Sequence, residues 1–336
     1  MYLRSLLVIL AIGLSLCFEA GHGKESYLFS KFQEFTETHN KKYSTIEEYL
    51  QRFKIFQNNY NKIERMQISP DSTPAFNLGI TKFFDLTPQE FRNTYLNLKV
   101  SLKDIIHAKS HGHLALLEEG DVPASHDWRD HGAVGPVKDQ GYCGSCWAFS
   151  TVANLEGLNF IKNKVFQQYS EQQLVDCDKV DQGCNGGLME NAFDYIKSAG
   201  GIELSKDYPY KGSDGKCRFD QSKAALKVKG FHFAPSDNEE DIKNMLFTTG
   251  PLSVALNADV LQYYRNGIVD FDANDCDPQG INHGVSIVGY GSENGQDYWI
   301  VRNSWGASWG EKGYFRIARG KGTCGINTYV VSADLE

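Results

Sequence analysis

A cysteine at the start of an expected helix is the residue of this sequence best suited to nucleophilic chemistry. From Ser145 onward, apolar residues recur at helical spacing as far as Phe160, and Ser145 is a good N-cap. Cys146 would therefore lie in the first helical turn. Unpaired backbone N–H groups and the positive end of the helix dipole lower the pKa of a thiol there. The pattern predicts a reactive thiolate at Cys146, because the thiolate is the nucleophilic form.

Three further polar residues have the types that amide hydrolysis requires. His283 immediately precedes an apolar strand that ends in glycines, and Asn303 follows another apolar strand. They lie 137 and 157 residues after Cys146, and Gln140 offers an amide donor six residues before it. Hydrolysis of an amide needs a nucleophile, a proton carrier for the departing amine and donors for the developing oxyanion. These four residues supply one group for each task and one to orient the imidazole.

The motifs around these residues resemble the papain family of cysteine proteases, and the precursor resembles the cathepsin L branch. The matching stretches are Gln140–Ser150, Asn282–Gly291 and Tyr298–Gly306, and the resemblance runs from about Tyr27 to the C-terminus. It implies that Cys146 attacks the scissile carbonyl and that a cationic His283 stabilises the thiolate. Asn303 would orient the imidazole under the cover of Trp305, and Gln140 would form the oxyanion hole with the Cys146 backbone N–H.

The resemblance also implies where a peptide substrate binds. The glycines of the motif at 184–189 permit a close approach of the substrate backbone. The pocket for the second residue before the scissile bond (P2) would have Tyr329 at its floor, where cathepsin L has a small residue. We expect apolar P2 residues to be preferred and arginine to be poor, since no acidic residue is present. The substrate-binding residues would be Gly186, Gly187, Leu188, Met189, Ala255, Ile281, Gly284, Trp305 and Tyr329.

The cysteine count leaves two other functions open. Of eight cysteines, Cys17 lies in the expected leader, so seven remain and one thiol should stay free. Cys143 and Cys146 could instead form the redox pair of a thiol-disulfide oxidoreductase, and an inactive protease-like binding protein is the other alternative. No second pair of cysteines has matching spacing, so we expect no metal and no cofactor. By the resemblance, the disulfides would be Cys143–Cys184, Cys177–Cys217 and Cys276–Cys324.

The N-terminus and the composition predict a secreted or lysosomal-type protein. Arg4 precedes an apolar run from Leu6 to Leu16, which predicts a signal peptide over residues 1–23, cleaved between about 17 and 23. This run is too short to span a bilayer. The 336 residues carry a net charge of −8 without a basic patch for nucleic acid. We expect a monomer without a membrane span, bound for a lysosome, an acidic digestive vacuole or the extracellular space.

Residues 24–121 are interpreted as a helical pro-region that inhibits the protease within the same chain. Ser26 is a candidate cap for a first helix. In the next helix five residues share one face, and Glu48 and Arg52 would pair one turn apart. Their identities match the pro-region helix of cathepsin L-like zymogens, as do three residues of a later motif. The two sets are Glu48, Arg52, Phe56, Asn59 and Ile63, and Gly79, Phe83 and Asp85.

Residues 99–121 are predicted to form the linker that is cut on activation, and they suggest a pH-sensor hypothesis. Four histidines of the pro-region would become cationic as the pH falls toward 5: His39, His107, His111 and His113. The alternatives are that these are solvated loop residues, or that carboxyl groups such as those of Glu48 or Asp85 sense the pH instead.

The remaining 215 residues would form an α+β protease of two domains with a papain-like fold. Residues 122–235 carry the nucleophile helix and an expected helix over Met189–Ala199, whereas residues 236–336 are rich in apolar runs separated by glycines. The second half therefore predicts an antiparallel β-barrel. The active site would be the cleft between the halves, open to polypeptide substrates and to cystatin-type inhibitors. The expected strands are Leu252–Leu256, Gly267–Phe271, Val285–Gly289, Tyr298–Asn303, Gly313–Ala318 and Tyr329–Ala333.

Overall fold

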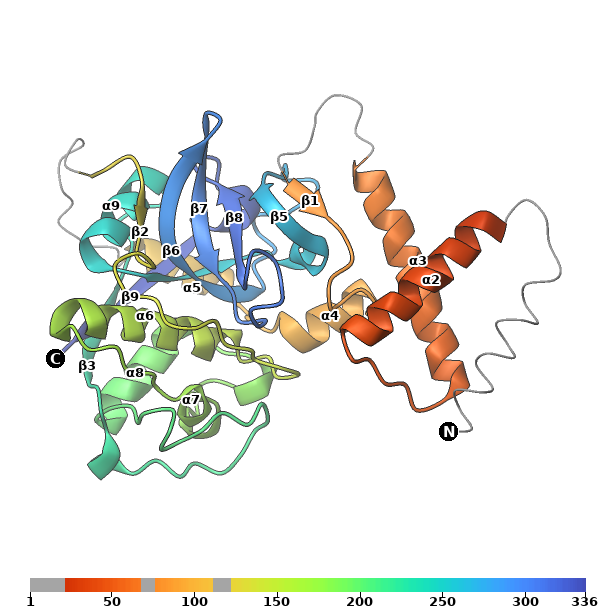
Figure 1. Cartoon of the computed structure of the whole chain (residues 1–336). Helices are drawn as coiled ribbons and strands as arrows, with labels where there is room; N and C mark the ends of the chain where they lie inside the picture. The colour runs from red at the N-terminus through yellow and green to blue at the C-terminus, as the bar shows by residue number, and fades with distance from the viewer. Residues whose placement is uncertain (1–21, 68–75, 111–121) are drawn as a thin grey trace.

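A computed structural model describes residues 22–67, 76–110 and 122–336. The expected signal peptide falls almost wholly outside these residues, as does the linker from residue 111 to 121. The helices α2 (His22–Thr38) and α3 (Ile46–Gln67) cross one another to one side of the main body (Figure 1). The main body combines a large mixed sheet with helices, so the expected α+β class is confirmed. No helix of the described residues is long and apolar enough to cross a membrane.

One sheet of nine strands dominates the second half of the chain. Its order is β1-β5-β8-β7-β6-β4-β9-β3, and β2 pairs with β6. All pairs are antiparallel except β5 with β8, which is parallel. The strands are β1 (Phe76–Leu78), β2 (His126–Asp127), β3 (Val228–Phe233), β4 (Leu252–Leu256), β5 (Tyr264–Val269), β6 (His283–Glu293), β7 (Gln296–Arg302), β8 (Tyr314–Ala318) and β9 (Tyr329–Leu335).

The sheet differs from the expected barrel in three respects. Among the described residues its strand order runs from β1 to β3 without returning, so closure into a barrel is not confirmed. The pro-region contributes β1, which pairs with β5 at one end of the sheet. The segment assigned to the helical half contributes β2 and β3, which pair with β6 and β9. These three strands are short or only partly apolar, and their partners lie far away in the sequence, so no local pattern predicts them.

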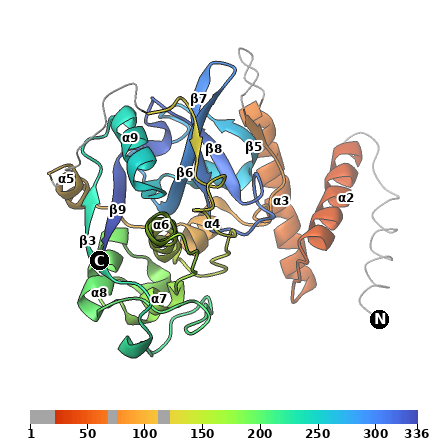
Figure 2. The same cartoon turned by 60° about the vertical axis from the view of Figure 1, so that its left-hand side comes forward.

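The helix α6 (Cys146–Asn163) lies between the sheet and the helices α7 (Glu171–Cys177) and α8 (Met189–Ala199) (Figure 2). Every residue from its start to Asn159 is buried, because the helix is covered on all sides. A further helix, α9 (Glu239–Thr249), covers part of the sheet. Four short 3-10 helices complete the main body: η1 (Gly183–Asn185), η2 (Gln221–Lys223), η3 (Asp259–Tyr263) and η4 (Thr323–Gly325).

Hydrogen bonds from small polar side chains join α6 directly to the sheet. The Ser150 hydroxyl donates to the Val285 carbonyl at 2.7 Å, and the Ser253 hydroxyl donates to the Ser150 carbonyl at 2.9 Å. Farther along α6, the Asn154 amide donates to the Pro251 carbonyl at 2.7 Å. All of these groups are buried, so each bond also satisfies a polar group that would otherwise be costly inside the protein. These bonds therefore fix the position of α6 relative to the sheet.

The pro-region and the sheet share one hydrophobic core. Phe32 of α2 and Phe56 of α3 are fully buried, and Phe56 packs against Phe84 with ring centroids 5.0 Å apart. Phe84 in turn packs against Tyr263 of η3, beyond which the cluster continues into the sheet. A second core lies around α6, α8 and β9. The main body contains the three expected disulfides, Cys143–Cys184, Cys177–Cys217 and Cys276–Cys324.

One local expectation about the pro-region is wrong, and part of the predicted linker is helical. The helix α2 begins at His22, so Ser26 lies inside it and does not cap it. The described part of the predicted linker contains the helix α5 (Leu102–Ser110), which begins where Ser101 and Asp104 bond to one another. This helix packs against the main body through the buried Ala108 and an ion pair between Lys109 and Asp237 at 2.7 Å. Tertiary contacts thus order part of the linker.

Candidate active site

Cys146 is the first residue of α6, and its thiol is free and fully buried. Ser145 occupies the N-cap position but forms no side-chain cap, which corrects the expectation from the sequence. Its hydroxyl instead bonds to the Tyr210 hydroxyl at 2.7 Å, and Tyr210 donates to the Gln140 carbonyl at 2.8 Å. The helix still starts at the expected residue, since tertiary contacts position this turn in place of a local cap.

His283 and Asn303 meet although they lie on different strands. His283 is the first residue of β6 and Asn303 follows β7, and these strands pair with Ser286 opposite Arg302. The His283 Nε2 to Asn303 Oδ1 distance is 2.8 Å. An amide oxygen only accepts, so Nε2 donates and Nδ1 is left with its lone pair available. His283 Nδ1 is buried, and the described part of the chain offers it no hydrogen bond.

Trp305 covers the imidazole, as expected. Its ring stacks on that of His283 with centroids 4.7 Å apart and an interplanar angle of 29°. Trp305 is fully buried. Asn303 Oδ1, which accepts from the imidazole, also accepts the Ser304 N–H at 2.8 Å. The imidazole and the amide are therefore held in place from two sides.

Gln140 presents its amide nitrogen toward the same site. The Ser304 hydroxyl donates to Gln140 Oε1 at 2.6 Å, which sets the orientation of the amide. Gln140 Nε2 then donates to the Cys143 carbonyl at 3.0 Å and to the Tyr95 carbonyl at 3.3 Å. The second acceptor belongs to the pro-region. The amide that would stabilise an oxyanion thus faces a backbone carbonyl of the covering chain.

Residues 95–98 start at the last residue of the helix α4 (Pro88–Tyr95) and lie directly across these groups; we call them the covering segment. The backbone N–H groups of Asn97 and Leu98 hydrogen bond to the Cys146 sulfur, and the Leu98 N–H donates to the Asn282 carbonyl at 3.1 Å. A Cβ at Gly186 would lie 1.9 Å from the Asn97 carbonyl oxygen, so this approach requires glycine. The covering segment closes the site with its backbone as well as its side chains.

The helix start predicts a thiolate at Cys146, but burial under the covering segment favours the protonated thiol instead. It raises the pKa of the Cys146 thiol to about 11, although backbone N–H groups pull in the other direction. Burial also lowers the pKa of His283 to about 4, against the smaller effects of Asn303 and Tyr95. A helix dipole contributes only about 0.3–1 kcal/mol in exposed sites, less than the cost of burying a charge. The thiol and the imidazole are both neutral in this covered state.

Leu98 packs among the residues that the sequence predicts for the substrate pocket. This side chain is buried in the core around α6, and a Cβ at Gly284 would lie 3.4 Å from its Cδ1. Tyr329 is fully buried, stacks edge-on against Phe233 with centroids 5.4 Å apart, and leaves its hydroxyl without a partner. The structure brings the expected pocket residues into one cluster with Leu98: Leu188, Met189, Ala255, Ile281 and Tyr329.

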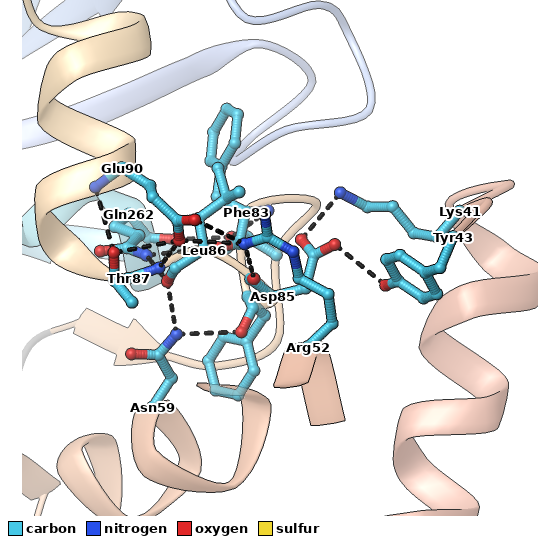
Figure 3. A network of polar contacts seen from close by, with 12 residues as sticks. Lys41, Tyr43, Arg52, Asn59, Phe83, Asp85, Leu86, Thr87, Glu90 and Gln262 are labelled. Carbon is cyan, nitrogen blue, oxygen red and sulfur yellow. Dashed lines mark hydrogen bonds and ion pairs between the residues drawn. The ribbon is translucent and has the colours of Figure 1, made fainter. Parts of the chain in front are cut away.

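The face of α3 that carries Arg52 and Asn59 binds the pro-region together, but not through the expected pair. Arg52 bonds to both carboxylate oxygens of Glu90 at 2.9 Å and to the Asp85 carbonyl at 3.1 Å (Figure 3). Glu48 instead accepts the Ser44 N–H at 2.7 Å, which corrects the predicted pair of Glu48 and Arg52. Nη1 of Arg52 thus contacts both oxygens of a carboxylate from another helix, and such charge-assisted bonds are stronger than neutral ones.

The same network anchors the pro-region to the main body. Asn59 donates to the carbonyls of Phe84 and Leu86 at 2.9 and 2.8 Å, and it accepts the Tyr263 hydroxyl at 2.9 Å. From η3, Gln262 donates to the Leu86 carbonyl at 2.8 Å (Figure 3). These bonds hold the turn before α4 against the sheet. These bonds therefore fix the position of α4, and with it the covering segment, relative to the candidate site.

Phe83 inserts into the aromatic cluster around the candidate site. It is buried and packs edge-on against Trp305, with ring centroids 5.1 Å apart. Phe91 and Tyr95 of α4 complete the cover on the same indole ring. The residue that shields the imidazole is thus also the docking point of the pro-region.

The covering segment is the part of the site that sequence analysis missed. Its residues carry no distinctive pattern, because much of what they contribute is backbone. One local signal was available: Thr87, Pro88 and Glu90 form a complete capping box at the start of α4. That signal predicts the helix α4, but it does not predict that the residues after the helix lie across the candidate site.

Two family models match the chain. The model of papain family cysteine proteases matches residues 122–333, and that of the cathepsin propeptide inhibitor domain matches residues 32–91.

Known proteins match along nearly the whole chain. Cysteine proteinase 1 of Dictyostelium discoideum is 42% identical over 321 residues, which cover 90% of this chain and 91% of that protein. Cathepsin L of Sarcophaga peregrina is 42% identical over 304 residues, which cover 86% of this chain and 88% of that protein. The structure of the digestive procathepsin L2 proteinase from the larval midgut of Tenebrio molitor superposes with a TM-score of 0.83 at 35% identity. It covers 92% of this chain and 100% of its own.

Proposed function

Because this chain belongs to the papain family of cysteine proteases and carries the propeptide inhibitor domain of cathepsins, we propose that it is the zymogen of an endopeptidase acting through Cys146, His283 and Asn303. The observation that carries the proposal is the covering segment, which lies on the thiol, the imidazole and the Gln140 amide at once. The oxidoreductase alternative needs a redox pair of Cys143 with Cys146. Cys143 is bonded to Cys184 instead.

The proposed reaction begins when the covering segment leaves. Water then reaches Cys146 and His283, the desolvation penalty on both charges falls, and the proton of the thiol can pass to His283 Nδ1. The thiolate attacks the carbonyl carbon of the substrate, and the developing oxyanion accepts hydrogen bonds from Gln140 Nε2 and the Cys146 N–H. The Gln140 amide is available because its pro-region acceptor, the Tyr95 carbonyl, has gone.

His283 completes both halves of the proposed cycle. As an imidazolium it gives its proton to the departing amine when the C–N bond breaks, and a thioester on Cys146 remains. The neutral imidazole then takes a proton from water, whose oxygen attacks the thioester, and the acid product and the free thiol are released. Throughout the cycle, Asn303 holds the imidazole by its Nε2–H.

Acidic activation is supported by the carboxyl group that caps α4. Burial alone would raise the pKa of Glu90, but hydrogen bonds from Thr87 and the charge of Arg52 lower it below its ordinary value of 4.5. A carboxyl group with a lowered pKa stabilises the docked state above its ordinary value and loses that contribution as the pH falls through the lowered value. The fold of the pro-region, which holds the covering segment in place, should therefore weaken in acid, as in a lysosome or an acidic vacuole. His111 and His113 lie outside the described residues, and His107 packs against Phe233.

The function is tested by incubating the purified precursor with a thiol reductant over a pH series. Processing is expected to be slow at pH 7 and to accelerate below about pH 4.5, where the Glu90 contribution is lost. Sequencing of the new N-terminus should place the cut between about residues 99 and 122, and peptidase activity should appear with it. A precursor that is cut by an added protease but then cleaves no peptide would refute the proposal.

The P2 preference is a finer part of the proposal, and it predicts the effect of Tyr329→Ala. Removing this ring deepens the pocket that now holds Leu98, so the ratio of kcat/KM for Phe over Val at P2 should rise about tenfold. Val330→Ala is the matched control, because Val330 lies next to Tyr329 on β9 but packs in the other core. An unchanged ratio with activity retained would remove Tyr329 from the pocket.

A further inference from the structure

Two carboxyl side chains face one another behind the glycines that line the candidate substrate site. Asp181 lies in the turn between α7 and η1, and its Oδ1 accepts the Leu188 N–H at 3.1 Å and the Asn191 side-chain amide at 2.9 Å. A Cβ at Gly187 would lie 2.6 Å from Asp181 Cγ, so the carboxyl group packs directly against this glycine. We call Gly186, Gly187 and Leu188 the substrate wall; Asp181 supports it from behind.

Asp178 supports Asp181 in the same manner. It is the C-cap residue of α7, and its Oδ1 accepts the N–H groups of Val180 and Asp181 at 2.9 and 3.3 Å. The second oxygen of each carboxyl group, Oδ2, is buried and receives no hydrogen bond from any donor in the described part of the chain. The two carboxyl groups lie close enough to share a hydrogen bond. Because carboxylate oxygens only accept, such a bond exists only when the pair holds a proton.

The neighbouring charges do not replace that proton. Lys179 is next to Asp178, but its ammonium group donates to the Asp176 carbonyl at 2.6 Å. Tyr195 of α8 lies near Asp178 and takes a hydrogen bond from Gln173. Asp194 and Lys197 of α8 border the adjoining surface depression, and Asp214 bonds to the Cys184 N–H across the turn. No ion pair with either Asp178 or Asp181 is present in the described part of the chain.

The proton is retained well above the pH at which carboxyl groups ordinarily lose it. Burial raises the pKa of Asp181 to about 8, and the facing carboxyl group of Asp178 adds to the effect. Burial likewise raises the pKa of Asp178. Two carboxyl groups that share a site cannot both ionise without strong repulsion. The pair therefore keeps a proton at neutral pH and loses it as the pH rises above about 8.

We propose that Asp181, through the proton it shares with Asp178, is a positioning residue that holds the substrate wall in its binding geometry and releases it in alkaline solution. Loss of the proton turns the hydrogen bond between the carboxyl groups into a repulsion. Asp181 then moves away from Asp178, and the backbone of Leu188 and Gly187 moves with it. Substrate binding weakens while the chemistry at Cys146 and His283 is unaffected. This inference rests on the proposed peptidase function.

The test uses the mature enzyme, released from the full precursor, and its Asp181→Asn variant. The new amide keeps the oxygen that accepts from Leu188 and Asn191, and its N–H₂ donates to Asp178 at every pH. With a peptide that has leucine at P2, the wild-type KM should rise about fivefold between pH 6 and pH 9. The KM of Asp181→Asn should stay flat over this range. The pH dependence of kcat should be the same in both.

Controls separate the positioning role from a merely structural one. Asp194→Asn removes a charge from the exposed face of α8 without touching the wall, so its KM profile should follow the wild type. If Asp181→Asn does not fold, Asp178→Asn supplies the same donor from the other side and should give the same flat profile. An equal rise of KM in the wild type and the foldable amide variant would overturn the inference.

A stability measurement keeps the inference separate from the proposed function. A carboxyl group whose pKa is raised on folding binds an extra proton in the folded state, so stability falls as the pH rises from about 4 to about 8. In precursors that carry Cys146→Ala, the melting temperature should therefore decline more over this range with Asp181 than with Asp181→Asn. Equal declines would overturn the inference. A wild-type enzyme that cleaves nothing would instead refute the peptidase function.

Discussion

Replacing Cys146 with alanine is expected to abolish peptide-bond cleavage while leaving the precursor folded. The substitution removes the group that forms the covalent intermediate in the proposed reaction, so kcat/KM should fall at least about a thousandfold. The fold should persist because alanine fits at the first turn of α6, and the sulfur makes bonds only with backbone N–H groups around it. Purified variant and wild type, activated by the same added protease, are compared on one peptide substrate.

Serine at the same position is the informative companion to alanine. A serine hydroxyl has nearly the shape of the thiol, but it does not transfer its proton to His283 to form a stable ion pair. Cys146→Ser should therefore be almost as inactive, which separates loss of the nucleophile from loss of volume. Both variants should be processed by added wild-type enzyme. Activity above about a thousandth of the wild type in the alanine variant would exclude Cys146 as the nucleophile.

Phe83→Ala is expected to release the inhibition by the pro-region at neutral pH. Truncating a buried phenylalanine costs about 3–5 kcal/mol, and here the lost contacts are with Trp305 of the main body as well as with Phe91 and Tyr95. Even the lower figure raises the population of undocked precursor by about a hundredfold. Precursor carrying the substitution should therefore cleave a peptide at pH 7 at a rate about a hundred times that of the wild-type precursor.

Tyr27→Ala provides the comparison for that experiment. Tyr27 lies on α2, is exposed, and contacts Tyr60 within the pro-region instead of the main body. The inhibition of its precursor at pH 7 should be unchanged, which shows that undocking requires the Trp305 contact. If the precursor with Phe83→Ala remained latent at pH 7, the aromatic cluster would not be the anchor of the pro-region.

The residues of the candidate site were predictable because each lies at the end of an element with a clear local pattern. Cys146 begins α6, His283 begins β6 and Asn303 follows β7, so the motif and the element boundary coincide. The strand β4 and the helix α8 were also predicted to the residue, since their apolar runs are bounded by glycine or proline. The motifs carry more specific information than the periodicity alone.

The remaining differences arise where a distant partner outweighs a local preference. Ser145 bonds to Tyr210 and does not cap its own helix, and Arg52 reaches Glu90 in preference to Glu48 one turn away. The protonation of Cys146 follows the same logic: the helix start favours a thiolate, but the covering segment removes the water that a charge needs. None of these partners is encoded near the residue it affects.

The hydrogen bonds of Ser150, Asn154 and Ser253 have a consequence for the kinds of protein that this enzyme can attack. Because they tie the helix that carries Cys146 to the strands beside His283, the two walls of the site cannot swing apart to admit a bulky, folded chain. We therefore expect the opening to admit one extended segment, as it now admits the covering segment. On the proposed function, the preferred substrates would be loose termini, long loops and polypeptides already denatured by acid. The rate of proteolysis would then depend on how fast the substrate protein unfolds.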